Sequence, residues 1–471
     1  MMTRNDNLRV GTLKQLKSGD PSERCLAVES LFNENLTDTL VEDICTMLED
    51  NDKGVRNTVD LMLSVNPSPQ IPEHLVKYVS SPNISTRNLA GEILLKIGNH
   101  SVGTMLNHIY LGSDDDKKFL VDILGLIGDP KAAPEILELL RINKNDNVIM
   151  ACIEALGNLR YEDALDFMIL FYDKNELYKP TIIESLGKIG TSKALDFILL
   201  KYHGEDNLTK FSMIESLGLI GNQDSFYFLI SELNNTDGPL VWPIVESIYL
   251  LKTKYNLDVP FDEKMKNLIL QTIEEADSKY RRTAVKLVVA FEGIDITQAC
   301  MNVFGEDYET DEIIKHRMSE NPKRFFEILI ALLKNGCKNI KSLLEFSLKL
   351  IQEDEFKYND YLTELQIRNL IDSLINCLNN PYEEVRRLAI ELLFIIDDEN
   401  ALLFIDKMIK DDNLWNKLKL LEILGGIKNS AAEGAIVKLA GDKEEMISER
   451  ANFFLSQRPD IQLESKHENI I

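Results

Sequence analysis

Apolar and polar residues follow the period of amphipathic α-helices along this chain, and no stretch alternates as a half-buried strand would. Residues 40–48 carry apolar side chains at helical spacing, and the polar segment 49–54 follows them. Residues 55–63 then repeat the helical pattern before the next turn. We therefore expect pairs of short helices joined by polar turns.

One acidic position recurs through the chain and marks these helix pairs as internal repeats. It falls at 29, 60, 92, 122, 154, 184, 215 and 246, in steps of 30–32 residues, and returns at 391 and 422. Helices this short are marginal alone, because an isolated helix needs roughly 12–15 residues to be stable in water. Stacking of neighbouring repeats must supply the stability, so we expect an all-α stack of about 12–13 helix pairs.

The repeat resembles the HEAT-repeat family in its short-period bacterial form, as in PBS-lyase-like HEAT repeats. The likeness rests on Leu-Gly-x-Ile-Gly helix ends at 124–128, 186–190 and 217–221, with Ala132 and Ala194 opening the next helix. It covers about residues 7–252 and 361–456 and implies a right-handed α-α superhelix whose second helices line the concave face. Arg56 and Arg386 match the family's Arg early in the second helix. The resemblance implies that this Arg pairs with an Asp of the inter-helix turn, and Asp52 is the candidate partner of Arg56.

The period breaks in the middle of the chain. Glu246 and Glu391 are 145 residues apart, which is not a whole number of repeats. We expect acidic loops at 305–312 and 353–361 on either side of a helical hairpin at roughly 322–352. The predicted organisation is therefore repeats over 1–255, an irregular helical middle segment over 256–360, repeats over 361–456 and a flexible tail over 457–471.

The charge balance limits the classes of partner. The 52 Lys and Arg residues face 77 Asp and Glu residues, which gives a net charge of −25. Such a chain lacks the basic excess that nucleic acid and anionic lipid attract, so basic protein segments are the expected partners. The longest apolar run, Ile328–Leu333, is too short to span a membrane. The six Cys residues are scattered without a Cys-x-x-Cys pair, and we expect a cytoplasmic protein.

The recurring acid lies two residues after a core position, as in Cys152 and Glu154, and two residues are about 200° around a helix. The carboxylates should therefore point away from the first helices. Two interpretations stay open: a solvated row of good helix formers, or a row that binds a basic segment. The candidate partner-binding residues are Glu92, Asp122, Glu154, Glu184, Glu215 and Glu246. Tyr308 and Tyr358, in the acidic loops, either join an interaction patch or tuck against the adjacent helices.

No catalytic, metal-binding or cofactor-binding residue is predicted. The glycine pairs 125/128, 187/190 and 218/221 recur once per repeat and are interpreted as helix C-caps, not as a nucleotide clamp. Deoxyhypusine hydroxylases, which also resemble HEAT repeats, bind metal through repeated His-Glu dipeptides, whereas the one such dipeptide in this chain is His467-Glu468 in the tail.

The predicted function is a non-catalytic scaffold or adaptor that binds a Lys/Arg-rich protein or peptide along an acidic concave face. The alternative is a HEAT-derived enzyme such as a phycobilin-lyase-like protein, although no lyase-specific residue can be named. The sequence leaves the oligomeric state open.

Overall fold

The computed structural model describes residues 14–32, 34, 36–66, 68–352 and 358–458. Throughout these ranges the ordered elements are helices, and no described residue forms a strand. The chain divides into two compact units, Met1–Val259 and Pro260–Ile471. The prediction of an all-α solenoid is confirmed. Residues 459–471, which make up most of the predicted tail, lie outside the described ranges.

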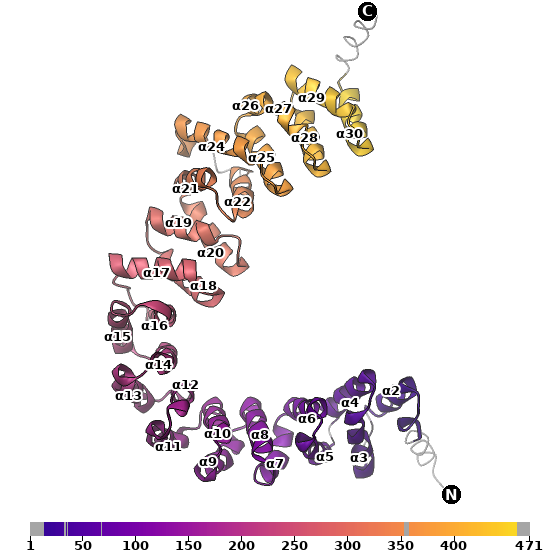
Figure 1. The fold of residues 1–471 in the computed structure, drawn as a ribbon, viewed down its shortest axis with the longest axis vertical. Coiled ribbons are helices and arrows are strands. Elements are labelled where there is room, and N and C mark those ends of the chain that lie inside the picture. Colours follow the sequence, from indigo (N-terminus) through magenta and orange to yellow (C-terminus); the bar gives the residue numbers. More distant parts are fainter. Residues whose placement is uncertain (1–13, 33, 35, 67, 353–357, 459–471) are drawn as a thin grey trace, which may run out of the picture. The chain divides into compact units, whose positions relative to one another are not determined.

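The first unit consists of two helical layers (Figure 1). One layer contains the first helix of each pair: α3 (Asp38–Thr46), α5 (Gln70–Leu75), α7 (Asn99–His108), α9 (Ala133–Ile142), α11 (Leu165–Phe171), α13 (Ser192–Lys201) and α15 (Gln223–Leu233). The other contains α2 (Pro21–Glu29) and the second helices: α4 (Lys53–Val65), α6 (Ile84–Ile97), α8 (Asp114–Ile127), α10 (Asp146–Asn158), α12 (Lys179–Ile189), α14 (Asn207–Ile220) and α16 (Val241–Tyr255). Each second helix packs against the second helix of the next repeat, which makes this layer continuous.

The second unit repeats this arrangement. Its first helices are α17 (Glu263–Glu275), α19 (Ile294–Val303), α21 (Pro322–Asn335), α24 (Glu364–Cys377), the broken pair α26 (Asp398–Leu403) and α27 (Ile405–Met408), and α29 (Ser430–Ala440). Its second helices are α18 (Ser278–Val288), α20 (Tyr308–Glu320), α22 (Ile340–Gln352), α25 (Glu383–Ile396), α28 (Leu414–Gly426) and α30 (Glu445–Ser456). Seven pairs in the first unit and six in the second agree with the predicted 12–13 pairs for the described residues.

The middle segment, residues 256–360, contains three of the six helix pairs of the second unit, α17 to α22. The helices α18, α20 and α22 begin 30 and 32 residues apart, so the repeat length is retained there. The departure lies in two longer connections. One precedes α17, and the other separates α22 from α24 and contains the short helix α23 (Tyr358–Tyr361). The predicted boundary at 360/361 stays a prediction.

The predicted acidic loop at 305–312 is wrong beyond residue 307, because α20 begins at Tyr308. The side chain of Asp307 accepts a hydrogen bond from the backbone N–H of Thr310 at 2.9 Å and caps this helix. Glu309 and Asp311 then lie in the first turn, where carboxylates interact favourably with the helix dipole. The acidic residues therefore start a helix. Most of the other predicted loop, residues 353–357, lies outside the described ranges.

Ion pairs join successive repeats at one register position. A basic residue early in a second helix pairs with an acid in the following inter-helix turn, 25 or 26 residues later. The pairs are Arg24–Asp50, Lys179–Glu205, Arg281–Glu306, Arg386–Asp411 and Lys417–Asp442. They connect each helix to the next repeat in addition to the apolar core.

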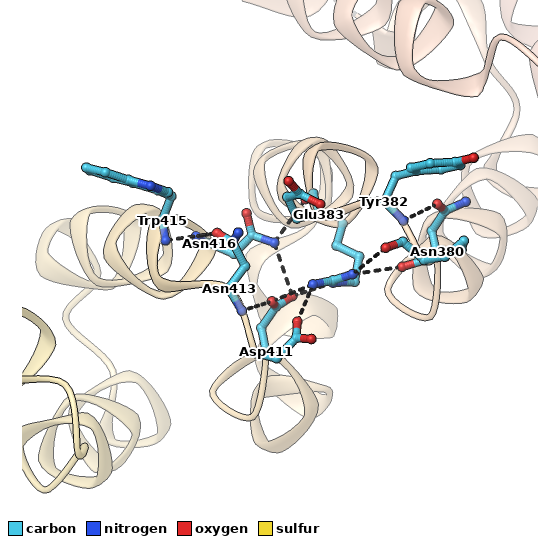
Figure 2. A network of polar contacts seen from close by, with 10 residues as sticks. Asn380, Tyr382, Glu383, Asp411, Asn413, Trp415 and Asn416 are labelled. Carbon is cyan, nitrogen blue, oxygen red and sulfur yellow. Dashed lines mark hydrogen bonds and ion pairs between the residues drawn. The ribbon is translucent and has the colours of Figure 1, made fainter.

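The pair between Arg386 and Asp411 is the most extensively hydrogen-bonded. The Nε and Nη2 atoms of Arg386 lie 2.8 and 3.0 Å from the two carboxylate oxygens of Asp411. The same carboxylate accepts hydrogen bonds from the backbone N–H of Asn413 at 2.9 Å and from the side chain of Asn416 at 3.2 Å (Figure 2). Asn416 also donates to the carbonyl oxygen of Glu383 at 2.9 Å, so the network ties α25 to α28.

The proposed pairing of Arg56 with Asp52 is wrong. Arg56 donates to the backbone carbonyl oxygens of Asp50 and Asn51, at 2.5 and 3.1 Å. Asp52 instead caps α4, because its side chain accepts a hydrogen bond from the N–H of Val55 at 3.0 Å. The charged partner of such an Arg belongs to the turn of the next repeat, as Arg24 and Asp50 demonstrate.

Candidate functional site

The acidic row comprises Glu92, Asp122, Glu154, Glu184, Glu215 and Glu246, one from each second helix between α6 and α16. Each carboxylate directly follows a buried residue of its helix and is itself exposed or half-exposed. The second helices form one continuous layer, so the row runs along a single face of the first unit. The predicted alignment of these acids is a property of the fold, whereas their role in binding stays a prediction.

Small residues bring the helices of this layer close together. Ser185, Ser216 and Ser247 directly follow three of the acids, and each hydroxyl donates to a carbonyl oxygen of the preceding second helix: Ile153 at 2.9 Å, Ile183 at 3.1 Å and Ile214 at 2.8 Å. Each serine also faces a glycine of that helix. A Cβ added at Gly157, Gly187 or Gly218 would lie 2.6 Å from the serine Oγ. We call these three contacts the glycine–serine seam.

The seam corrects part of the glycine interpretation. Gly128 and Gly190 do end helices in the left-handed region, with φ of 76° and 80°. Gly221 also ends its helix, although its φ is −59°. Gly125, Gly187 and Gly218 lie inside α8, α12 and α14, where a neighbouring helix leaves no room for a side chain. Sequence reasoning missed this role. The sequence does contain a signal for this role. A serine directly follows the acid in the repeat after each of Gly157, Gly187 and Gly218.

Intramolecular cations neutralise the first part of the acidic row. The Lys96 ammonium lies 2.8 Å from the carboxylate of Glu92 and 2.9 Å from that of Asp60. Hydrogen bonds to Glu92 and Asp60 raise the pKa of Lys96. Lys118 lies 2.6 Å from Asp122. These lysines reduce the charge that α4, α6 and α8 present to a partner.

Glu154 and Glu184 differ from these acids. Both are exposed, and neither forms an ion pair within the described part of the chain. Glu184 accepts one hydrogen bond, from the hydroxyl of Ser212 at 3.4 Å. Glu215 and Glu246, further along the row, are half-buried. The carboxylates that a basic ligand meets at the lowest desolvation cost are therefore those of Glu154 and Glu184.

Two shallow depressions adjoin these glutamates. The first, about 280 Å³, is lined by Lys118, Asp122, Leu126, Ala151, Glu154, Ala155 and Asn158. The second, about 350 Å³, is lined by Gly125, Leu126, Gly157, Asn158, Arg160 and Lys188. Leu126 and Asn158 line both, so the two depressions adjoin each other, and together they extend over α8, α10 and the end of α12. The surface is mixed in charge, because Arg160 and Lys188 lie beside the open glutamates.

Exposed leucines accompany the acids. Leu126, Leu219 and Leu250 each lie four residues after an acid of the row, which puts both on the same face of their helix. Leu126 and Leu219 are 66% and 60% exposed. Sequence reasoning did not select these leucines, because a leucine in a repeat helix is ordinarily assigned to the core. The face therefore offers apolar contacts in addition to charge.

In the second unit the acidic position is less available. The carboxylate of Glu391 lies 3.2 Å from Lys419 and 3.9 Å from Arg387, and its side chain is 12% exposed. Glu422 is exposed. Lys286 replaces the acid in α18. The row of available carboxylates consequently belongs to the first unit.

The two predicted tyrosines do not behave alike. Tyr308 is the first residue of α20 and is 75% exposed. Tyr358 is half-buried, and its hydroxyl donates to the carbonyl oxygen of Ile396 at 2.7 Å. Tyr358 thus tucks against the end of α25, whereas Tyr308 keeps an accessible ring. A binding role for either residue stays a prediction.

The described residues contain no group of three or more His, Cys, Asp or Glu side chains arranged to hold a metal ion. The six cysteines are free thiols. Burial raises the pKa of Cys45, Cys152 and Cys300 to about 12, which disfavours the reactive thiolate. His467 and Glu468 lie outside the described ranges. In the part of the chain that is described, every helix is too short or too polar to span a membrane.

A comparison with protein families matched residues 111–178 to the family described as HEAT repeats. This segment contains α8, α9 and α10 and thus the first depression. The predicted resemblance to the HEAT-repeat family is confirmed. A comparison with curated proteins gave no match.

Solved structures with a similar arrangement of helices include karyopherins. Kap121p is 12% identical with a TM-score of 0.44, and the similarity covers 95% of this chain and 56% of Kap121p. Importin beta is 10% identical with a TM-score of 0.42, covering 95% of this chain and 72% of importin beta. Yeast importin-beta (Kap95p) is 14% identical with a TM-score of 0.38, covering 96% and 69%. This chain therefore spans little more than half the length of Kap121p.

Proposed function

We propose that this chain is a non-catalytic scaffold or adaptor, and that the second-helix layer of its first unit binds a Lys/Arg-rich segment of a protein partner. The observation that carries the proposal is the pair of exposed glutamates, Glu154 and Glu184, which have no ion pair among the described residues. The layer is the face expected to be concave. The cytoplasmic location also stays a prediction.

The seam supports the proposal mechanically. Binding costs less when the surface is already ordered, because fewer side chains and loops lose freedom on association. Three serine hydroxyls bonded to the neighbouring helix fix the spacing of α10, α12, α14 and α16. The distances between successive carboxylates are thereby set before the partner arrives.

Recognition would combine charge with apolar contact. An exposed ion pair contributes only about 0.2–1 kcal/mol, so two glutamates alone give weak binding. Leu126 and Leu219 add apolar area on the same face. Lys188 and Arg160 would repel a ligand that carries basic residues along its whole length, because both cations line the second depression. The preferred partner segment therefore alternates basic and apolar residues.

Charge reversal tests this function. The variant E154K/E184K should bind a peptide of alternating Lys and Leu about tenfold more weakly than wild type, and the salt dependence of binding should diminish. Fluorescence anisotropy of the labelled peptide at several salt concentrations measures both effects.

The matched control is D196K/D224K. Asp196 and Asp224 are exposed acids of α13 and α15, in the other layer, and their reversal changes the net charge by the same amount. Unchanged binding in E154K/E184K, or an equal loss in the control, would contradict the proposal. So would a chromophore that co-purifies with the protein, which an absorbance scan would detect.

A further inference from the structure

Four leucines of the first unit are exposed at two register positions of consecutive repeats. Leu170 and Leu200 lie next to the ends of α11 and α13 and are 77% and 81% exposed. Leu177 and Leu208 lie near the starts of the following second helices and are 63% and 67% exposed. We call these four residues the leucine patch. Repeated exposure of large aliphatic side chains at matching positions is typical of an interaction surface.

Polar and aromatic contacts join the chain segments that carry the four leucines. Lys201, which follows Leu200, lies 2.9 Å from the carboxylate of Asp173, three residues after Leu170. The rings of Phe171 and Tyr178, which follow Leu170 and Leu177, stack with their centroids 5.4 Å apart. The four leucines therefore lie on segments of two successive repeats that are held against each other.

A second ion pair joins the segments that carry Leu177 and Leu208. Lys179 lies 3.0 Å from Glu205, so the residues beside Leu177 and Leu208 are also joined across the repeats. The Lys179 and Glu205 side chains are 11% and 8% exposed, which fixes the two helix starts against each other. The spacing of the leucines is thus built into the fold.

The charges among these leucines cancel. Lys179 also lies 2.8 Å from Glu176, and Lys201 pairs with Asp173. Lys174 is exposed and adds a third cation. With Lys210, two residues after Leu208, four lysines thus balance the four acids Asp173, Glu176, Glu205 and Asp206. This local neutrality contrasts with the net charge of −25 of the whole chain.

We propose that the leucine patch is the surface through which a second copy of this chain docks, about a two-fold axis. Two copies that each carry −25 repel one another, so they approach most easily where both surfaces are neutral and apolar. Around a two-fold axis the spacing matches automatically, because Leu170 faces Leu200 of the partner subunit and the reverse. A second copy therefore presents a surface with the same leucine spacing and the same neutral charge.

This inference does not rest on the proposed function. The leucine patch lies at the ends of first helices and the starts of second helices, whereas Glu154 and Glu184 lie further along the second helices. The two activities also respond oppositely to salt. Salt weakens capture of a basic segment, but it screens the repulsion between two acidic copies and so strengthens their association.

The test is the solution mass of the full chain. Light scattering or sedimentation over a range of protein concentrations should record a shift from one to two copies, at lower concentration when salt is raised. The variant L170E/L200E should weaken the association at least about 100-fold, because it places four carboxylates in the contact between the two copies. Circular dichroism verifies that the variant keeps its helices, and the milder L170S/L200S serves if it does not.

The control is L403E. Leu403 is 77% exposed in the second unit, on α26, and should leave the association unchanged. A wild-type chain that remains a single copy at every concentration and salt would overturn the proposal. Association of L170E/L200E at the wild-type level would overturn it too, and so would an equal loss in L403E.

Discussion

At Gly187, an added Cβ would lie 2.6 Å from the Oγ of Ser216 and 2.9 Å from its Cβ. Real Cβ atoms do not approach so closely, so any side chain at this position must move the neighbouring helix or expel the serine hydroxyl. That hydroxyl donates to Ile183 and is buried, and losing the bond would leave a buried polar group unsatisfied. The spacing of α12 and α14 thus depends on the absence of one methyl group.

We expect G187A to lower the free energy of unfolding by about 2 kcal/mol, because overpacking a tight contact costs that order. The matched control is G434A, in α29, where an added Cβ meets nothing within 4 Å. That substitution should raise stability by about 0.5–1 kcal/mol through helix propensity alone. Urea unfolding of both variants measures the contrast. A gain in stability for G187A would show that the seam does not set the helix spacing.

Between elements, the Arg386–Asp411 pair shows how successive repeats are locked. The Asp411 side chain is 6% exposed and that of Arg386 is 13% exposed. Burial alone would raise the pKa of Asp411, but hydrogen bonds from Arg386, Asn413 and Asn416 outweigh it and hold the pKa below its ordinary value. The folded chain therefore prefers the ionised carboxylate, and ionisation is coupled to stability.

We predict that D411N loses about 3 kcal/mol at neutral pH, because it leaves Arg386 without its buried counter-charge. The lowered pKa means that the stability from Asp411 is present above the ordinary Asp pKa, about 3.9, and is lost as pH falls through the lower folded value. The difference between D411N and wild type should therefore shrink under acid conditions. Chemical unfolding at pH 7 and at pH 3 measures it.

Asp412 provides the control for this experiment. It lies 2.5 Å from the same guanidinium, but its side chain is 90% exposed. D412N should cost less than about 1 kcal/mol, since exposed ion pairs contribute little. Equal losses for D411N and D412N would mean that burial does not govern this contact.

The elements themselves could be predicted from the sequence better than their contacts. The period of the acid at 154, 184 and 215 located the second helices and the face they share. The partners of Arg56 were missed because they are backbone carbonyl oxygens, which leave no signal in the sequence. Charged pairs such as Arg24–Asp50 join different repeats, and helical periodicity does not reveal which turn faces which helix. The ion pairs that neutralise Glu92 and Asp122 could have been predicted from the sequence, since Lys96 and Lys118 lie four residues away on the same helices.

At the scale of the whole molecule, the two units each contain their own apolar core. Repeat proteins are stabilised by contacts between neighbours, so a long enough block of repeats can fold without the rest. The first unit has seven helix pairs, well above the few that a solenoid requires. The division at Val259 lies close to the place where the period of the acid breaks after Glu246, next to the predicted boundary at 255/256, which itself stays a prediction.

We predict that residues 1–259 fold alone. Circular dichroism should show a helical protein, and urea unfolding should be cooperative with an m-value about half that of the full chain, because m scales with the surface exposed on unfolding. An unfolded or non-cooperative fragment would mean that the first unit needs the second. The net negative charge of the fragment favours its solubility.

The glycine–serine seam also restricts how such a chain can change over generations. Each contact needs a glycine in one repeat and a small residue in the next, as Gly157 with Ser185 and Gly218 with Ser247. A repeat gained or lost as a whole preserves these partners, whereas a single inserted residue within a second helix would turn the glycine by 100° away from its serine. Copies of the repeat can accumulate differences elsewhere, but a substitution along the seam requires a matching substitution in the next repeat. The similarity between repeats should therefore be retained longest at the seam positions.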